Sequence, residues 1–135
     1  MVQSVIAVLP TLATSASASS SESALIRETL DRDGVEVRIV GSPEGALDAL
    51  AAERSPVILY DADTGQPWRD ALPRFFAARP GVRIVLLTEF ANHKTWLDLF
   101  DNGGFDLLLR PLRPADLRAV VRCALDPPKF FHAAA

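Results

Sequence analysis

Five short apolar runs recur along the chain, separated by stretches in which apolar residues follow a helical period. The runs are rich in Val, Ile and Leu, and the run at residues 57–60 shows almost no polar alternation, which is typical of a strand covered on both faces. We expect strands at residues 4–9, 35–40, 57–60, 82–87 and 106–109. Strands that alternate with helices in this way predict a doubly wound parallel α/β sheet, because right-handed crossovers place helices on both of its faces.

The first two helices have recognisable terminal signals. A Ser/Ala/Thr-rich loop at residues 10–21 follows the first strand, and Ser19 and Glu22 have the spacing of a capping box that would start a helix. Gly34 is placed to end that helix. Ser42, followed directly by a proline, predicts an N-cap with proline at the first helical position of the second helix.

Three further helices are expected downstream. The helix at residues 68–78 contains Pro73, which we expect to kink or restart it because proline lacks a backbone N–H. The helix at residues 91–102 should end at a Gly-Gly pair. That helix is expected to turn three large apolar side chains inward: Trp96, Leu99 and Phe100. Pro114 opens the last helix, which carries an apolar stripe along one face.

Length and composition indicate a single folded domain. The chain has 135 residues, of which 49% are hydrophobic and 23% charged, so it can bury a core without a disulfide or a metal. We assign residues 1–125 to this domain and residues 126–135 to a tail or the start of a linker. No apolar stretch approaches the length of a membrane span, and the first twenty residues lack the basic start of a signal peptide. We therefore expect a cytoplasmic protein.

Charge and missing motifs narrow the classes of function. The formal net charge of -3 argues against a large nucleic-acid footprint. The sequence contains neither a glycine-rich dinucleotide fingerprint nor a Walker lysine. We therefore expect no enzymatic activity beyond accepting a phosphoryl group, no contact with nucleic acid and no contact with a membrane.

Candidate chemistry gathers at the carboxyl ends of the predicted strands. Asp61 follows the third strand, Thr88 ends the fourth and Arg110 follows the fifth. Ligands of open α/β sheets bind beyond these strand ends, so we expect the three side chains to converge on one cleft. A carboxylate can accept a phosphoryl group as an acyl phosphate, while a hydroxyl and a cation hold its oxygens. The set predicts phosphoryl chemistry centred on Asp61.

Three local segments carry a resemblance to a known family. They are the VILYD run that ends at Asp61, the IVLLT run that ends at Thr88 and the GGFDLLLRPL segment around Arg110. From about Val5 to Leu125 the chain resembles a response-regulator receiver domain of the CheY-like type. The resemblance implies a flavodoxin-like fold with strand order 2-1-3-4-5, phosphorylation of Asp61, and phosphoryl contacts from Thr88 and Arg110. It also implies protein partners, namely a histidine kinase, an output domain or both.

The chain departs from the family pattern in three places. Receiver domains carry an acidic pair that helps to bind Mg²⁺ after the first strand, where this chain has Val8-Leu9-Pro10-Thr11. Arg110 replaces a lysine, and its planar fork is longer than an ammonium and shaped differently. Leu107 stands where an aromatic residue couples the site to a partner surface. We therefore expect weak or altered coupling.

These departures argue against strong Mg²⁺ binding. Mg²⁺ requires near-octahedral oxygen ligands that usually include one or two carboxylates. Asp61 is the main candidate and Asp63 a second one, and Glu22 could also reach the site. Hydroxyls of the loop after the first strand are further candidates: Thr11, Thr14 and Ser15. Without a competing cation, Arg110 could pair with Asp61, which would keep that carboxyl ionised and hold the site in one state.

Two hypotheses of different classes follow. In the first, the chain is an atypical receiver in which phosphorylation of Asp61 shifts a partner surface between two conformations. In the second, it is a phosphorylation-independent pseudo-receiver that serves as a constitutive dimerisation or interaction module. We place the partner surface, and a possible homodimer, on the last two helices, where three arginines lie: Arg113, Arg118 and Arg122. A third possibility is that Arg110 and loop hydroxyls bind some other small anion in the same cleft.

Overall fold

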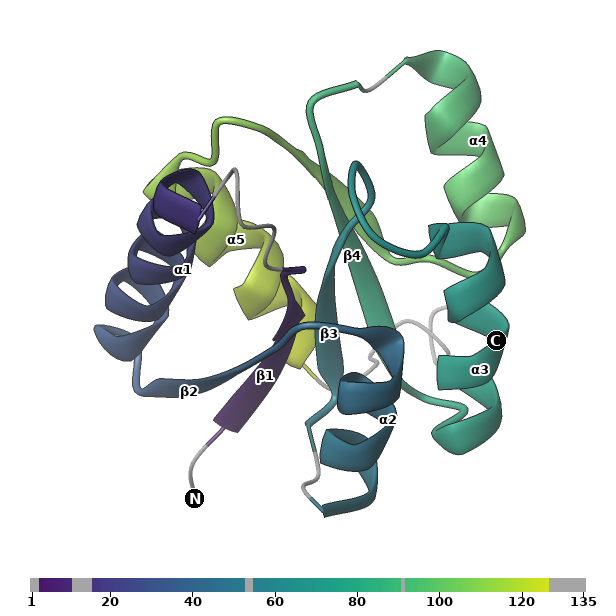
Figure 1. Ribbon diagram of the computed structural model, residues 1–135, viewed down its shortest axis with the longest axis horizontal. Helices are drawn as coiled ribbons and strands as arrows, with labels where there is room; N and C mark the ends of the chain where they lie inside the picture. The colour runs from purple at the N-terminus through teal and green to yellow at the C-terminus, as the bar shows by residue number, and fades with distance from the viewer. Residues whose placement is uncertain (1–2, 11–15, 53–54, 91, 127–135) are drawn as a thin grey trace, which may run out of the picture.

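The computed structural model describes residues 3–10, 16–52, 55–90 and 92–126. Five parallel strands form one sheet in the order β2-β1-β3-β4-β5 (Figure 1). The strands are β1 (Gln3–Val8), β2 (Val35–Val40), β3 (Val57–Asp61), β4 (Arg83–Thr88) and β5 (Asp106–Leu109). The predicted fold class and strand order are confirmed, and each strand lies within two residues of its expected position.

Five helices cover the two faces of the sheet (Figure 1). They are α1 (Ala16–Asp31), α2 (Pro43–Ala52), α3 (Trp68–Ala78), α4 (His93–Asp101) and α5 (Pro114–Leu125). Buried side chains of α1 and α5 form one core cluster with one face of the sheet. Those of α2, α3 and α4 form a second cluster on the other face.

The central strands supply side chains to both clusters, which explains their unbroken apolar runs. Ile6 and Val8 of β1 belong to the α2–α4 side, and Val5 and Ala7 belong to the α1–α5 side. All five residues of β3 are buried. A polar residue in the middle of such a strand would lack water on either face, so the polar residue of β3, Asp61, is its last residue.

Several predicted helix termini are confirmed. Ser42 accepts a hydrogen bond from the backbone N–H of Gly45 at 3.1 Å, which makes it the N-cap of α2. Gly34 follows α1 with a φ of 74°, a left-handed conformation that glycine adopts at no steric cost. Gly103 has a φ of 85° after α4 for the same reason.

Three expectations about the helices are wrong. The first helix begins at Ala16, three residues before Ser19, so the expected loop is shorter. Helix α3 continues through Pro73, which lies on its exposed face, so the expected restart is wrong and the expected kink stays a prediction. Phe100 is 51% exposed rather than inward. Its ring instead contacts Trp96, 5.3 Å away between centroids, because α4 lies at one end of the sheet and buries only Leu99.

The C-terminal boundary expected for the domain lies at the end of the described residues. The expected tail or linker at residues 126–135 lies outside the described residues except for Asp126, so this boundary stays a prediction. None of the helices in the described ranges is long and apolar enough to cross a membrane.

Candidate functional site

The three predicted site residues come from three neighbouring strands of the sheet. Asp61 and Thr88 are the last residues of β3 and β4, and both are buried. Arg110 follows β5, and its backbone N–H donates to the carbonyl of Thr88 at 2.9 Å. A cis peptide bond joins Arg110 to Pro111. The structure therefore brings the three side chains to one edge of the sheet, as the sequence predicts.

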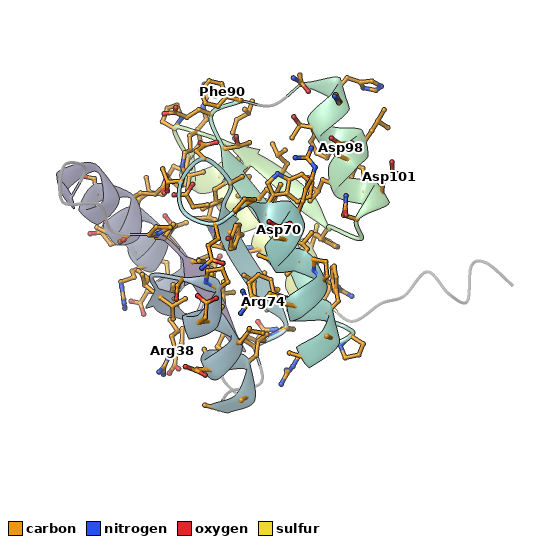
Figure 2. All side chains as sticks on the ribbon, turned by 45° about the vertical axis from the view of Figure 1, so that its right-hand side comes forward. Arg38, Asp70, Arg74, Phe90, Asp98 and Asp101 are labelled. Atoms are coloured by element: carbon orange, nitrogen blue, oxygen red, sulfur yellow. The ribbon has the colours of Figure 1, made fainter. Side chains whose placement is uncertain are left out.

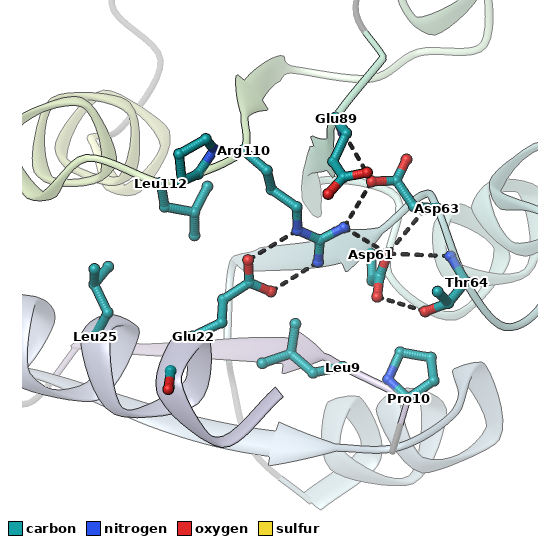
Figure 3. Close-up of a pocket in the computed structure, with 12 residues that line it drawn as sticks. Leu9, Pro10, Glu22, Leu25, Asp61, Asp63, Thr64, Glu89, Arg110 and Leu112 are labelled. Carbon is teal, nitrogen blue, oxygen red and sulfur yellow. Dashed lines mark hydrogen bonds and ion pairs between the residues drawn. The ribbon is translucent and has the colours of Figure 1, made fainter. Parts of the chain in front are cut away.

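The guanidinium of Arg110 is the centre of the site (Figure 3). Its Nη1 donates to Asp61 Oδ1 at 2.8 Å and to Asp63 Oδ2 at 3.0 Å. Its Nε and Nη2 form a two-pronged contact with the carboxylate of Glu22 at 2.8 and 2.7 Å. Nη1 also donates to the carbonyl of Leu87 at 3.3 Å. One cation thus binds three carboxylates.

Asp61 is held by more than the arginine. Its Oδ1 accepts from the backbone N–H of Asp63 at 2.8 Å and of Thr64 at 3.2 Å, in addition to Arg110. Its Oδ2 accepts from the hydroxyl of Thr64 at 2.6 Å. The side chain is only 9% exposed. Both carboxylate oxygens are therefore engaged by groups of the chain itself.

Thr88 is turned toward a neighbouring carboxylate. Its hydroxyl donates to Asp63 Oδ1 at 2.6 Å and accepts from the N–H of Phe90 at 3.0 Å. The other oxygen of Asp63 accepts from the N–H of Glu89 at 2.8 Å as well as from Arg110. Asp63 thus links the end of β4 to the guanidinium, a role that its sequence position does not reveal.

Glu22 reaches the site from α1. The sequence offered it in two ways, as the last residue of a capping box and as one of several groups that could reach the cleft. Because α1 begins at Ala16, Glu22 lies inside the helix, and its carboxylate pairs with Arg110, 88 residues away in the chain. The loop hydroxyls suggested as further ligands lie outside the described residues: Thr11, Thr14 and Ser15.

The contacts within the site keep Asp61 and Arg110 in their charged forms. Burial alone would raise the pKa of Asp61, but hydrogen bonds from Arg110 and Thr64 outweigh it and lower this pKa below its ordinary value. Burial alone would lower the pKa of Arg110, but its contacts with Glu22 and Asp61 raise it further above its already high value. Since an arginine stays protonated in any case, both groups remain charged across the neutral range.

The carboxylates of the site are turned toward Arg110 rather than grouped around a position for a metal ion. In the described ranges, no group of three or more His, Cys, Asp or Glu residues is arranged to hold a metal. The carboxylates of Asp61 and Asp63 instead face Nη1 of Arg110, which lies within 3.0 Å of an oxygen from each. A cavity of about 550 Å³ opens beside this cluster, lined by Glu22, Asp61 and Arg110 together with apolar residues such as Leu25 and Leu112 (Figure 3).

The residues suggested for a partner surface are placed differently from one another. Arg118 of α5 makes a two-pronged contact with Asp33 at 3.0 and 2.9 Å, and Arg122 lies 4.0 Å from the same carboxylate. Arg113 precedes α5 and is exposed. Leu107, at the position of the coupling aromatic, is 6% exposed and belongs to the core. An interface role for the three arginines stays a prediction.

The sequence is similar to curated bacterial regulators over most of its length. No family model matches it. It is 30% identical over 110 residues to the regulatory protein LuxO of Vibrio vulnificus, an alignment that covers 78% of this chain and 24% of LuxO. The luminescence regulatory protein LuxO of Vibrio campbellii is 28% identical over the same coverage. The chain thus spans about a quarter of the length of these relatives.

Solved structures of response regulators have the same fold. The chemotaxis response regulator CheY4 of Vibrio cholerae superposes with a TM-score of 0.76 at 19% identity, covering 93% of this chain and all of that chain. A response regulator of Thermotoga maritima gives 0.77 at 18% identity, with 93% and 98% covered. NtrX of Brucella abortus gives 0.75 at 18% identity, with 93% of this chain and 27% of NtrX covered. The chain therefore has the fold of response-regulator receiver domains and is similar in sequence to part of LuxO.

Proposed function

We propose that this chain is a response-regulator receiver domain that works without phosphorylation, with Arg110 as a cation built into the site in place of a metal. The observation that carries the proposal is the set of contacts made by one guanidinium with three carboxylates, those of Glu22, Asp61 and Asp63. Such a site is already assembled in one state. Signalling would then depend on the contacts of the domain with other proteins.

A dication would have to compete with Arg110 for the same oxygens. Mg²⁺ gives up its water reluctantly and requires near-octahedral ligands. One oxygen of Asp61 and one of Asp63 are already bound to Nη1 of Arg110, at 2.8 and 3.0 Å. Displacing the guanidinium from these oxygens would leave the largely enclosed Arg110 with Glu22 as its remaining carboxylate partner in the described ranges, which is costly in a site with little water.

A phosphoryl group would meet an unfavourable charge at Asp61. Phosphoryl transfer requires cations that neutralise the charge developing on the phosphoryl oxygens. The single positive charge of Arg110 is here shared by three carboxylates, so the cluster has an excess of negative charge. The hydroxyl of Thr88, which the family uses on the phosphoryl group, donates to Asp63 instead.

The proposed output is a protein contact on the α4 side of the domain. Four large apolar side chains are at least half exposed there and at the neighbouring strand ends: Phe90, Leu97, Phe100 and Leu109. Figure 2 shows Phe90 at one end of the molecule. Because LuxO and NtrX are several times longer than this chain, we propose an output domain or a histidine kinase as the partner.

The deciding experiment is intact mass spectrometry after incubation with acetyl phosphate and Mg²⁺. The wild type is compared with an Asp61→Asn variant and with a standard protein that takes up a phosphoryl group under the same conditions. We expect the standard to gain a phosphoryl group and the wild-type chain to gain none. A phosphoryl group gained by the wild type but not by the Asp61→Asn variant would overturn the proposal and show that Asp61 is a phosphoacceptor.

A calorimetric titration with Mg²⁺ tests the built-in cation separately. We expect no heat of binding to the wild type at millimolar Mg²⁺. Saturable binding that the Asp61→Asn variant lacks would show that the ion displaces Arg110, and the proposal would fail on this point even without phosphorylation.

A further inference from the structure

Strand β2 forms an open edge of the sheet. In the described part of the chain it pairs with β1 alone, in continuous register from Gln3 opposite Val35 to Val8 opposite Val40. The strand is six residues long and contains neither proline nor an interruption of the register. Natural proteins usually shorten, bend or cover such an edge, because its free backbone groups can bind another strand.

The backbone groups that face outward can be identified. The carbonyl of Val40 accepts a hydrogen bond from Leu9, which continues β1, so Val40 directs its backbone groups toward β1. Successive residues of a strand direct these groups to opposite sides. Val35, Val37 and Ile39 therefore present their N–H and C=O groups to the free edge.

The side chains of β2 give this edge a charge pattern that complements itself. Glu36 and Arg38 lie on one face of the strand and are both exposed, and Arg38 is visible on the outside of the molecule (Figure 2). The residue between them is Val37. If two copies of the strand run antiparallel with Val37 opposite Val37, then Glu36 of each copy lies opposite Arg38 of the other.

We propose that a second copy of this chain binds along β2, so that two five-stranded sheets join in one antiparallel seam. In this register Val35 faces Ile39 of the second copy, and each outward-facing residue meets another outward-facing residue. The backbone groups of Val35, Val37 and Ile39 can then all pair across the seam. Opposite charges across an antiparallel pair are stabilising, and like charges are destabilising.

The neighbouring registers are disfavoured by the same charges. A shift by one residue in one copy would place an outward-facing residue opposite an inward-facing one, so the ladder cannot form. A shift by two residues places Glu36 opposite Glu36 in one direction and Arg38 opposite Arg38 in the other. The charge pattern thus selects a single symmetric arrangement.

Space for the second strand lies beside β2. A hollow of about 430 Å³ is lined by α1 and β2, through Arg27, Glu28 and Asp31 on the helix and Val35 to Val37 on the strand. A second hollow of about 410 Å³ continues along the strand to Ile39. Val37 and Ile39 are only partly buried there. A second copy would cover these side chains with its own.

The proposal concerns a different surface from the Asp61 site and does not depend on the proposed function. Arg38 already has a contact within the chain. That contact does not prevent an ion pair across the seam, because a guanidinium carries five N–H donors.

Sedimentation equilibrium of the chain, with a reducing agent because Cys123 is exposed, tests the proposal. We expect the wild type to dimerise. Glu36→Lys and Arg38→Glu should each place two pairs of like charges across the seam and weaken the dimer by about tenfold or more. An equimolar mixture of the two variants restores both ion pairs and should dimerise as tightly as the wild type.

A Val37→Pro variant removes a central N–H from the seam and should also be monomeric. Asp70→Lys, on the exposed face of α3, serves as the matched charge-reversal control and should still dimerise. Circular dichroism confirms the fold of each variant. A wild type that stays monomeric at high concentration overturns the proposal. So does a dimer that survives both charge reversals, or one that Asp70→Lys disrupts.

Discussion

Two arginines of this domain each bind a carboxylate through two nitrogens, but one is largely enclosed by the protein and the other is exposed to solvent. Arg110 binds Glu22 at 2.8 and 2.7 Å, and Arg118 binds Asp33 at 3.0 and 2.9 Å. The side chain of Arg110 is 13% exposed and also binds two further carboxylates. That of Arg118 is 45% exposed, and the only other cation near its carboxylate in the described ranges is Arg122.

The difference shows that the geometry of an ion pair does not by itself determine how much the pair stabilises the fold. An exposed pair gains little, because both groups also interact well with water when unpaired, and salt screens the attraction that is left. An enclosed cation that holds several carboxylates cannot be removed without leaving uncompensated charges in a site with little water. We therefore expect the two arginines to differ widely in what their loss does to the fold.

Replacing Arg110 with methionine should produce the largest effect. The change leaves Glu22, Asp61 and Asp63 facing one another without a counter-charge. We expect a loss of about 2–4 kcal/mol in the free energy of unfolding at neutral pH, somewhat below the value for a fully buried pair because the cavity admits solvent. Urea denaturation measures this loss.

The same variant should also regain stability in acid, since protonation relieves the repulsion among its carboxylates. A variant as stable as the wild type at neutral pH would mean that the cluster around Arg110 does not stabilise the fold, so that Arg110 and Arg118 would not differ in this respect.

Replacing Glu22 with glutamine should have a smaller effect. The amide keeps one acceptor for Arg110 but loses the charge, so we expect a loss of about 1–2 kcal/mol, toward the lower end of the range for hydrogen bonds to charged groups. The guanidinium keeps its contacts with Asp61 and Asp63. A loss as large as that of Arg110→Met, measured by the same denaturation, would show that Glu22 rather than Asp61 is the principal partner.

The stability that Asp61 contributes should depend on pH. The folded-state pKa of Asp61 is lowered, so its ionised form contributes stability above the unfolded-state pKa, and this contribution is lost as the pH falls through the folded pKa. The stability difference between the wild type and Asp61→Asn should therefore shrink below about pH 4. Denaturation curves at a series of pH values measure it. A difference that stays constant in acid would mean that the charge of Asp61 does not stabilise the fold.

Replacing Arg118 with alanine should have the smallest effect. The pair with Asp33 is exposed to water on both sides, so we expect a change in stability close to experimental error, and none at high salt. Denaturation at low and high salt concentration checks this. A loss comparable to that of Arg110→Met would show that accessibility does not distinguish the two arginines.

The sheet could be predicted from the sequence because its central strands are buried on both faces. A run such as residues 57–60 has few alternatives to a buried strand, and Gly34 and Ser42 mark helix ends by local chemistry. The start of α1 could not be predicted, because the Ser/Ala-rich segment before Ser19 has no apolar period. The exposure of Phe100 was missed because period alone does not reveal that α4 lies at one end of the sheet.

The candidate site was predictable only as far as topology determines it. Asp61, Thr88 and Arg110 end neighbouring strands, so their convergence follows from strand order. Strand order does not determine which acceptor each donor binds. Thr88 donates to Asp63, and two nitrogens of Arg110 donate to Glu22, 88 residues away in the sequence. Such choices depend on side-chain reach in the folded chain, which spacing alone does not encode.

The attachment of Arg110 to the backbone has a consequence for how the domain responds to its surroundings. A metal ion reaches its ligands from solution, so its occupancy follows the supply of that ion and falls when a chelator is added. The guanidinium is tethered beside its three carboxylates, and its effective concentration there does not change with dilution or dialysis. The charge balance of this site is consequently inherited with the polypeptide.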